Sequence, residues 1–116
     1  MGVFEKCTSL VSVDFPLITS VGQIAFYGCT SLEAADFPIA TYIGVDAFRG
    51  GCTSLVYVNS PLLTDIGDNA FNGCTSLEAV DFPLVTVIGL GVFDGCSSLE
   101  SVDFPLVTSI ENQGVS

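Results

Sequence analysis

The sequence contains no histidine, no tryptophan and only two basic residues, Lys6 and Arg49. Without histidine it lacks the side chain that most often serves enzymes as a general base. The two cations stand against 13 acidic residues, and the resulting net charge of −11 repels nucleic-acid backbones and anionic membrane surfaces. No apolar run approaches the roughly 18 residues of a membrane span, and the first residues do not resemble a signal peptide. We therefore expect neither nucleic-acid binding nor membrane insertion.

Catalytic motifs are missing as well. The chain has no Gly-x-Gly-x-x-Gly or other phosphate-binding loop, and its cysteines lack the cationic neighbours that would favour thiolates. Its carboxylates are expected on an open sheet, where nothing separates their pKa values into an acid and a base. The sequence therefore predicts no catalytic residue, no cofactor and no dedicated metal site, and we expect a protein that is not an enzyme.

The most regular feature that is present is a column of cysteines at intervals of 22, 23, 22 and 22 residues. Its members are Cys7, Cys29, Cys52, Cys74 and Cys96. A fixed period of this length is typical of a solenoid, in which each copy buries its apolar face against its neighbours. Neighbouring copies stack about 4.8 Å apart, farther than the Cβ separation of about 3.8 Å in a disulfide. We therefore expect free thiols that are buried as small apolar side chains.

Each copy has two extended legs and a turn. The segment Leu-x-x-Val-x-Phe predicts a short strand with Val and Phe inward, and the proline that follows ends it. A return leg with room for a second very short strand carries apolar columns that we expect in the core, among them Leu17, Ile39, Leu62, Leu84 and Leu106. The glycines after this leg suggest tight bends with positive φ, at Gly22, Gly44, Gly67 and Gly89. The cluster Ala-Phe-x-Gly predicts one helical turn that ends at a left-handed glycine.

The full pattern, Cys-Thr-Ser-Leu-x-x-Val-x-Phe-Pro followed by Ile-Gly-x-x-Ala-Phe-x-Gly-Cys, resembles the BspA-like subclass of leucine-rich repeats over nearly the whole chain. The resemblance implies a right-handed solenoid of about five repeats of 22–23 residues. Short parallel strands would line its concave face, and extended or short helical turns its convex side. It also implies a non-catalytic module for protein interaction or adhesion. Such modules belong to larger proteins that are secreted or on the cell surface, although this chain shows no signal peptide.

Three departures from the pattern stand out. The third copy has one extra residue at Arg49-Gly50-Gly51, which we expect in a loop. In the same copy Ser60 replaces an inward phenylalanine, so either the neighbours fill the space or the coil is locally loose. Both ends of the chain stop within a repeat and show no polar cap. We therefore expect residues 1–116 to form one array that is a piece of a longer one or that depends on partners at its ends.

The outward positions of the first strand carry the candidate binding residues. They form an acidic column, Asp14, Asp36, Asn59, Asp81 and Asp103, and beside it Glu33, Tyr57, Glu78 and Glu100. In leucine-rich repeats these positions form the concave surface. Like charges about 4.8 Å apart repel one another, so a repeated aspartate invites an explanation.

Three interpretations of this acidic column remain open. It can bind basic surfaces of protein partners, bind a cation weakly between neighbouring carboxylates, or serve as a solubilising residue copied with the repeat. We predict a protein-interaction module whose partner is basic where it touches. The alternative is a structural spacer or rod that associates end to end, with weak cation binding by the aspartates.

Overall fold

The computed structural model describes residues 8–100 and 109–110 of the chain. Each coil in this part contributes strands of two or three residues. The strands are β1 (Ser12–Asp14), β2 (Ser20–Val21), β3 (Ala34–Asp36), β4 (Tyr42–Ile43), β5 (Tyr57–Asn59), β6 (Asp65–Ile66), β7 (Ala79–Asp81), β8 (Val87–Ile88) and β9 (Ser109–Ile110). The expected second strand of the return leg is therefore present in every described coil.

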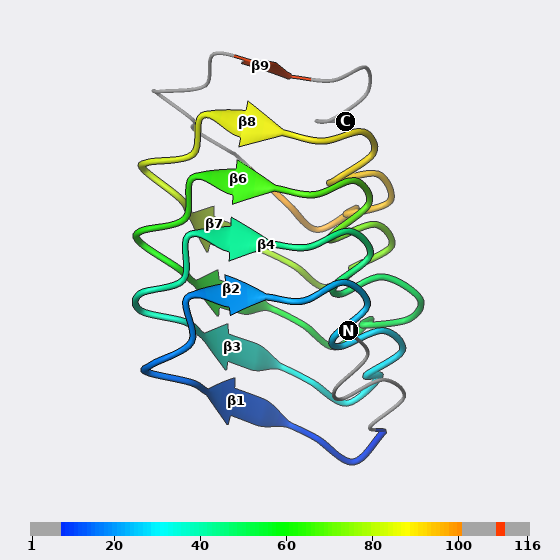
Figure 1. Cartoon of the computed structure of the whole chain (residues 1–116). Coiled ribbons are helices and arrows are strands. Elements are labelled where there is room, and N and C mark those ends of the chain that lie inside the picture. Colours follow the sequence, from blue (N-terminus) through cyan, green and yellow to red (C-terminus); the bar gives the residue numbers. More distant parts are fainter. Residues whose placement is uncertain (1–7, 101–108, 111–116) are drawn as a thin grey trace.

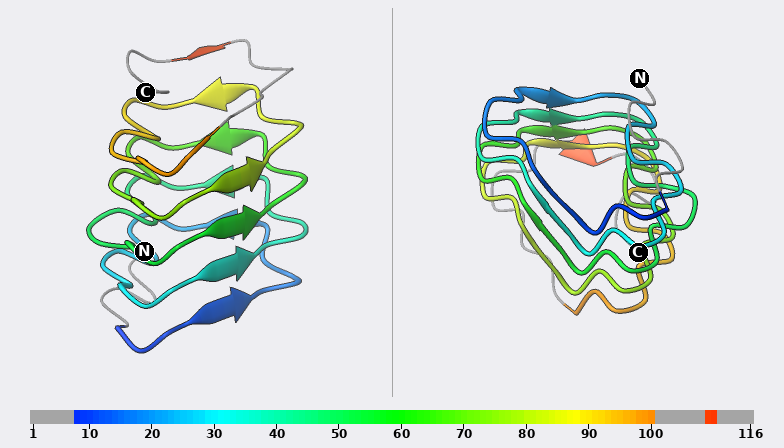
Figure 2. Two further views of the ribbon diagram at one scale, coloured as in Figure 1. Left: turned by 180° about the vertical axis from the view of Figure 1, so that it is seen from behind. Right: turned by 90° about the horizontal axis from the view of Figure 1, so that it is seen from below.

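The strands form two parallel sheets that run along the solenoid axis (Figure 1). Sheet A has the order β1-β3-β5-β7, and sheet B has the order β2-β4-β6-β8-β9. Seen along the axis, the coils superimpose, with the two sheets on two sides and the turns on a third (Figure 2). The predicted repeat solenoid with parallel strands is confirmed. Cys7, Asp103 and Leu106, for which the sequence also made predictions, lie outside the described residues.

Two columns of phenylalanine fill the space between the sheets and the turns. The rings of Phe26, Phe48, Phe71 and Phe93 stack in sequence, with centroid separations of 5.1, 5.2 and 5.9 Å. Phe15 and Phe37 stack at 6.1 Å in the second column. This column is interrupted at Ser60, which is fully buried and donates a hydrogen bond from Oγ to the Phe37 carbonyl at 3.4 Å. The Ser60 hydroxyl therefore has a hydrogen-bond acceptor inside the core.

The turn side contains no helix in the described coils, so the predicted helical turn is wrong. Its backbone N–H groups alternate between two kinds of acceptor. The Ala25 N–H closes a turn onto the Gly22 carbonyl, whereas the Phe26 N–H donates to Ala47 of the next coil at 2.7 Å. Every second N–H group of the turn therefore bonds to the next coil and is not available for the hydrogen bonds within the segment that a helix requires. The left-handed glycine at the end of the turn is confirmed, with φ between 73° and 82° at Gly28, Gly50, Gly73 and Gly95.

The glycines that follow sheet B have a different role from the one predicted. Gly22, Gly44, Gly67 and Gly89 do not have positive φ. At Gly67 a Cβ would lie 2.6 Å from the Val45 backbone nitrogen of the preceding coil, and at Gly44 one would lie 2.8 Å from the Gln23 nitrogen. Glycine is thus required because successive backbones approach closely. The left-handed positions come two residues later, at Ile24, Asp46, Asn69 and Gly91.

The cysteine column is buried, and the described cysteines are free, as predicted. The thiols of Cys52, Cys74 and Cys96 also form hydrogen bonds that the spacing did not show. Sγ of Cys52 donates to the Phe26 carbonyl at 3.1 Å, and Sγ of Cys96 donates to the Phe71 carbonyl at 3.1 Å. Burial raises the pKa of Cys52 to about 12 and that of Cys96 to about 11. These thiols therefore remain protonated and link one coil to the next.

The extra residue of the third copy enlarges a turn, as expected. Gly50 and Gly51 both have positive φ, at 79° and 106°. A Cβ at Gly50 would lie 2.7 Å from the Tyr27 ring, so this ring packs directly on the glycine backbone. The insertion is accommodated by two glycines without a break in either sheet.

Candidate functional site

The outward face of sheet A carries the predicted acidic column. Parallel pairing places Asp14 beside Asp36, Asp36 beside Asn59, and Asn59 beside Asp81. The middle residue of each strand points into the core. Because side chains alternate along a β-strand, the four polar side chains at the strand ends point outward. The structure thus brings together every member of the column that it describes.

Asn59 changes the chemistry of the column at its centre. Its Nδ2 donates a hydrogen bond to Oδ1 of Asp36 at 2.6 Å. Its own Oδ1 accepts a long hydrogen bond of 3.5 Å from the Tyr57 hydroxyl on the same strand. The amide therefore joins an aromatic side chain to an aspartate of the neighbouring coil, where a fifth aspartate would add repulsion.

Tyr57 stands out from its neighbours on the face. Parallel pairing places it between Ala34 and Ala79, so the ring has small side chains on either side. It remains 40% exposed although it lies at the middle of the described sheet. Exposed tyrosines of this kind are enriched at protein interfaces because they combine apolar area with a polar tip.

A second column borders the first on the side where the strands begin. Glu33, Glu78 and Glu100 are exposed there, and Val56 takes the equivalent position in the third copy. Backbone bonds hold the column in register, since the N–H of Val56 donates to Glu33 and that of Glu78 donates to Val56. In the coils on either side of Tyr57, carboxylates therefore occupy both columns, whereas the coil of Tyr57 itself has Val56 and Asn59 at these positions.

No basic side chain neutralises this face within the described part of the chain. Arg49, the one cation there, lies in a turn and forms a 3.3 Å ion pair with Asp46. Among residues 8–100 and 109–110, no three or more His, Cys, Asp or Glu side chains come together as a metal site would require. The face therefore presents a negative field to an incoming partner, without a built cation site.

The sequence interpretation missed a second outward column beside the acidic one. Leu17, Ile39, Leu62 and Leu84, which were expected in the core, are exposed at the corner between the two sheets. The next residue of each coil faces inward instead, and Ala40, Leu63 and Val85 are fully buried. The prediction is wrong because the proline before each of these residues introduces a turn. The turn directs the first of two adjacent apolar residues outward and the second inward. The dipeptide Pro-Leu or Pro-Ile, which favours the two central positions of a turn, could have indicated this from the sequence.

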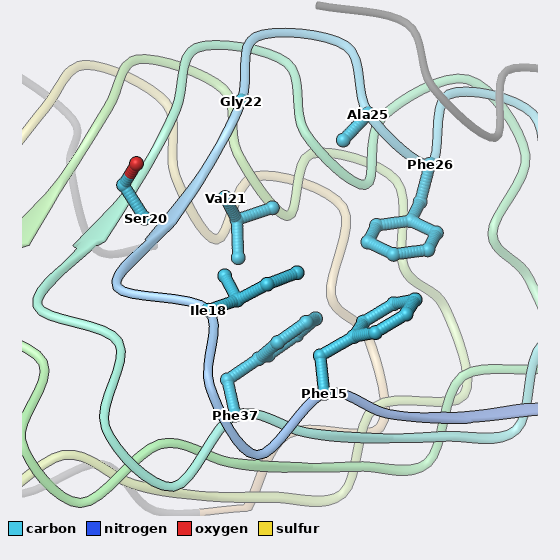
Figure 3. A pocket seen from close by; sticks show the side chains of 8 residues that line it. All are labelled: Phe15, Ile18, Ser20, Val21, Gly22, Ala25, Phe26 and Phe37. Atoms are coloured by element: carbon cyan, nitrogen blue, oxygen red, sulfur yellow. The ribbon is translucent and has the colours of Figure 1, made fainter.

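An apolar pocket of about 100 Å³ lies in the first described coil. In Figure 3 the rings of Phe15, Phe26 and Phe37 and the side chain of Ile18 surround it, while the Ser20 hydroxyl points away. Phe15 and Ile18 are only half-buried here, whereas their counterparts Phe37 and Ala40 in the next coil are buried. Within the part of the chain that the structure describes, the pocket is thus an incompletely covered region of the core, and its lining contains no charged group.

Comparison with known proteins agrees with this geometry. The BspA type Leucine rich repeat region matches residues 1–114, in six copies. The chain belongs to the BspA-type leucine-rich repeat family. Leucine-rich repeat proteins of this family are generally non-enzymatic modules for protein–protein interaction. The chain is a repeat interaction module. No curated protein matches the sequence.

Solved bacterial leucine-rich repeat proteins share the fold. The chain is 25% identical to a T. pallidum leucine-rich repeat protein, with a TM-score of 0.59 over 90% of this chain and 70% of that one. It is 27% identical to one from Bacteroides ovatus, with a TM-score of 0.66 over 86% of this chain and 30% of that one. A leucine-rich cell surface protein of Faecalibacterium prausnitzii is 24% identical, with a TM-score of 0.59 over 90% of this chain and 38% of that one.

The chain thus spans well under half of two of these three structures. As for membranes, the described part of this BspA-type array has no helix that is long and apolar enough to cross one.

Proposed function

We propose that this repeat array is a non-catalytic adhesion module that binds a basic surface of a partner protein through the outward face of sheet A. The residues assigned to that face are Asp14, Asp36, Asn59, Asp81, Asp103, Glu33, Tyr57, Glu78 and Glu100. The module acts as part of a longer protein that is secreted or on the cell surface. A cell surface protein among the similar structures supports this placement.

The observation that carries the proposal is the combination of charge and aromatic surface on one rigid face. Tyr57 lies between the two acidic columns, where its hydroxyl donates to Asn59, and the neighbouring coils carry carboxylates that no described cation neutralises. Fields of one sign steer oppositely charged partners and fall with salt, whereas an exposed tyrosine supplies contact area at low entropic cost. Solubility alone would explain the carboxylates but not an aromatic side chain at their centre.

Residue-resolved NMR tests the proposal. A peptide of alternating glycine and lysine is titrated into isotope-labelled protein at low and at high salt. We expect the amides of Ala34, Tyr57 and Ala79 to shift first, and the effect to weaken with salt. A peptide of alternating glycine and glutamate is the control. Shifts concentrated on sheet B or on the turns would contradict the proposal.

The second candidate function is a rod that associates end to end. The half-buried Phe15 and Ile18 at the apolar pocket favour it, since another coil stacked there would bury them as Phe37 and Ala40 are buried. Sedimentation over a range of concentrations tests this candidate. A monomer at every concentration would contradict it and would leave the binding proposal unaffected.

A further inference from the structure

The exposed corner between the two sheets carries an apolar column that the fold does not use. Leu17 is 84% exposed, and Ile39, Leu62 and Leu84 are 37%, 42% and 39% exposed. We call these four residues the corner ridge. Its members occupy the same position in four successive coils, so they form one continuous stripe and not scattered surface residues. Contiguous apolar surface on a soluble protein typically marks an interaction site.

The ridge is rigid because each of its residues sits in a closed turn. In the third coil, the Leu63 N–H donates to the Ser60 carbonyl at 3.1 Å, with Pro61 and Leu62 as the two central residues. The equivalent bond runs from Val85 to Phe82 at 3.3 Å in the fourth coil. Proline fixes φ at the first central position, and the turn then directs the second residue outward. A preorganised ridge loses little conformational freedom when a partner covers it.

The charges beside the ridge indicate what can cover it. Each ridge residue follows a member of the acidic column by three positions, as Leu17 follows Asp14 and Leu84 follows Asp81. Two copies packed ridge to ridge would bring acidic columns together in chains that each carry −11. The one described cation, Arg49, is already paired with Asp46 in a turn. A second copy is therefore disfavoured, and a basic occupant is favoured.

We infer that the corner ridge is the apolar half of the binding surface, and that its occupant is a basic amphipathic segment of the partner protein. Apolar side chains of that segment cover Leu17, Ile39, Leu62 and Leu84, while its lysine or arginine side chains reach toward Asp14, Asp36 and Asp81. This inference rests on the proposed function and adds to it. The partner must carry both an apolar stripe and positive charge, so charge alone does not define it.

The test uses two synthetic peptides and two variants. One peptide is a lysine-rich amphipathic helix with a leucine stripe, and the other has serine in place of each leucine. The ridge variant combines Leu17→Ser, Leu62→Ser and Leu84→Ser. The control is Leu90→Ser, because Leu90 is 45% exposed but lies on the turn side. Fluorescence anisotropy gives the affinities, and circular dichroism checks that each variant is folded.

The ridge inference predicts that the ridge variant binds the leucine peptide at least about ten-fold more weakly, while Leu90→Ser changes the affinity less than about two-fold. The serine peptide should bind weakly and should not distinguish the ridge variant from wild type. Equal affinity of the ridge variant and wild type for the leucine peptide would overturn the inference. So would concentration-dependent dimers of the wild type that the ridge variant abolishes, since these would make a second copy the occupant.

The two proposals can fail separately. If Asp→Asn changes on sheet A weaken binding but the ridge variant does not, the acidic face functions and the ridge inference is wrong. If the ridge variant weakens binding but the Asp→Asn changes do not, the ridge binds apolar surface and the acidic proposal fails, together with the basic half of the inferred occupant.

Discussion

Asn59 donates a hydrogen bond of 2.6 Å to Asp36 in the neighbouring coil of sheet A. Their pairing places an amide between Asp36 and Asp81, where a regular repeat would place a third carboxylate. Like charges directly opposite each other in a sheet are destabilising, whereas a hydrogen bond to a charged group is among the stronger kinds. The single asparagine therefore both interrupts the repulsion and fixes the orientation of Asp36.

Replacing this residue tests that relationship. Asn59→Ala removes the hydrogen bond and should lower the free energy of unfolding by about 1 kcal/mol, with little dependence on salt. Asn59→Asp also adds a like charge and should cost about 2 kcal/mol at low ionic strength, and less at high ionic strength. Urea denaturation at two salt concentrations measures both. The interpretation would be wrong if Asn59→Asp were as stable as wild type at low salt.

The buried thiols should make stability fall at alkaline pH. Unfolded cysteine ionises near pH 9, while burial raises the folded pKa to about 12 for Cys52 and about 11 for Cys96. The folded state keeps protons that the unfolded state releases, so the contribution is complete below pH 9 and is lost as pH rises toward 11 or 12. Above pH 9, Cys52→Ala should make the free energy of unfolding fall less steeply with pH, by up to about 1.4 kcal/mol per pH unit.

Urea denaturation of wild type and Cys52→Ala between pH 8 and pH 10.5 checks this prediction. Both proteins contain the same tyrosines, so tyrosine ionisation cancels in the comparison. A thiol reagent gives an independent measurement. The described cysteines should react slowly in the folded protein and readily in denaturant. Rapid labelling of the folded protein, or an unchanged slope in Cys52→Ala, would contradict the buried hydrogen-bonded column.

Two glycines should respond very differently to alanine. At Gly67 a Cβ would lie 2.6 Å from the Val45 nitrogen and 2.8 Å from the Gly44 carbonyl carbon, both in backbone that is held by the sheets. Gly67→Ala should therefore cost more than about 3 kcal/mol. Gly73 has a φ of 82° and no atom within 4 Å of its Cβ position, so Gly73→Ala should cost only about 1 kcal/mol.

Thermal denaturation of the two variants side by side gives the comparison. Equal losses of stability would contradict the view that close approach of the coils requires glycine at position 67.

Ile24 offers a stabilising substitution. It is a β-branched residue with a φ of 52°, whereas the equivalent positions hold Asp46, Asn69 and Gly91. Left-handed backbone costs an ordinary residue about 1–2 kcal/mol, and asparagine tolerates it better. Ile24→Asn should therefore raise stability by about 1 kcal/mol, and Asn69→Ile should lower it by a similar amount. A loss of stability in Ile24→Asn would mean that the packing of the half-buried isoleucine outweighs the strain.

The repeat period predicted the solenoid, the resemblance to BspA-like repeats implied parallel strands, and strand alternation predicted the outward acidic column. A period of 22 residues allows one register only, and strand alternation then separates Val13 and Val58 in the core from Asp14 and Asn59 outside. What the sequence did not reveal depends on turns. The direction of Leu17 is determined by the turn after Phe15, and the need for glycine at position 67 by a neighbouring coil. Apolar periodicity contains neither kind of information.

The thiol bonds and the Asn59–Asp36 contact were unpredictable for a related reason. Spacing shows which residues share a column, but not whether a side chain in that column bonds along the axis. A small buried residue and a hydrogen-bonded thiol have the same periodic signal. Only the geometry shows that Sγ of Cys52 reaches the Phe26 carbonyl in the neighbouring coil.

The most direct test of the central claim compares two double variants with the same change in net charge. One is Asp14→Asn with Asp81→Asn on sheet A, and the other is Asp65→Asn with Asp94→Asn on sheet B and a turn. The affinity of each for a peptide of alternating glycine and lysine is measured by fluorescence anisotropy at low salt. Binding through the acidic face predicts that the sheet A pair loses about five-fold or more and the other pair about two-fold or less. Equal losses would contradict the claim, because the peptide would then respond to net charge and not to the face of sheet A.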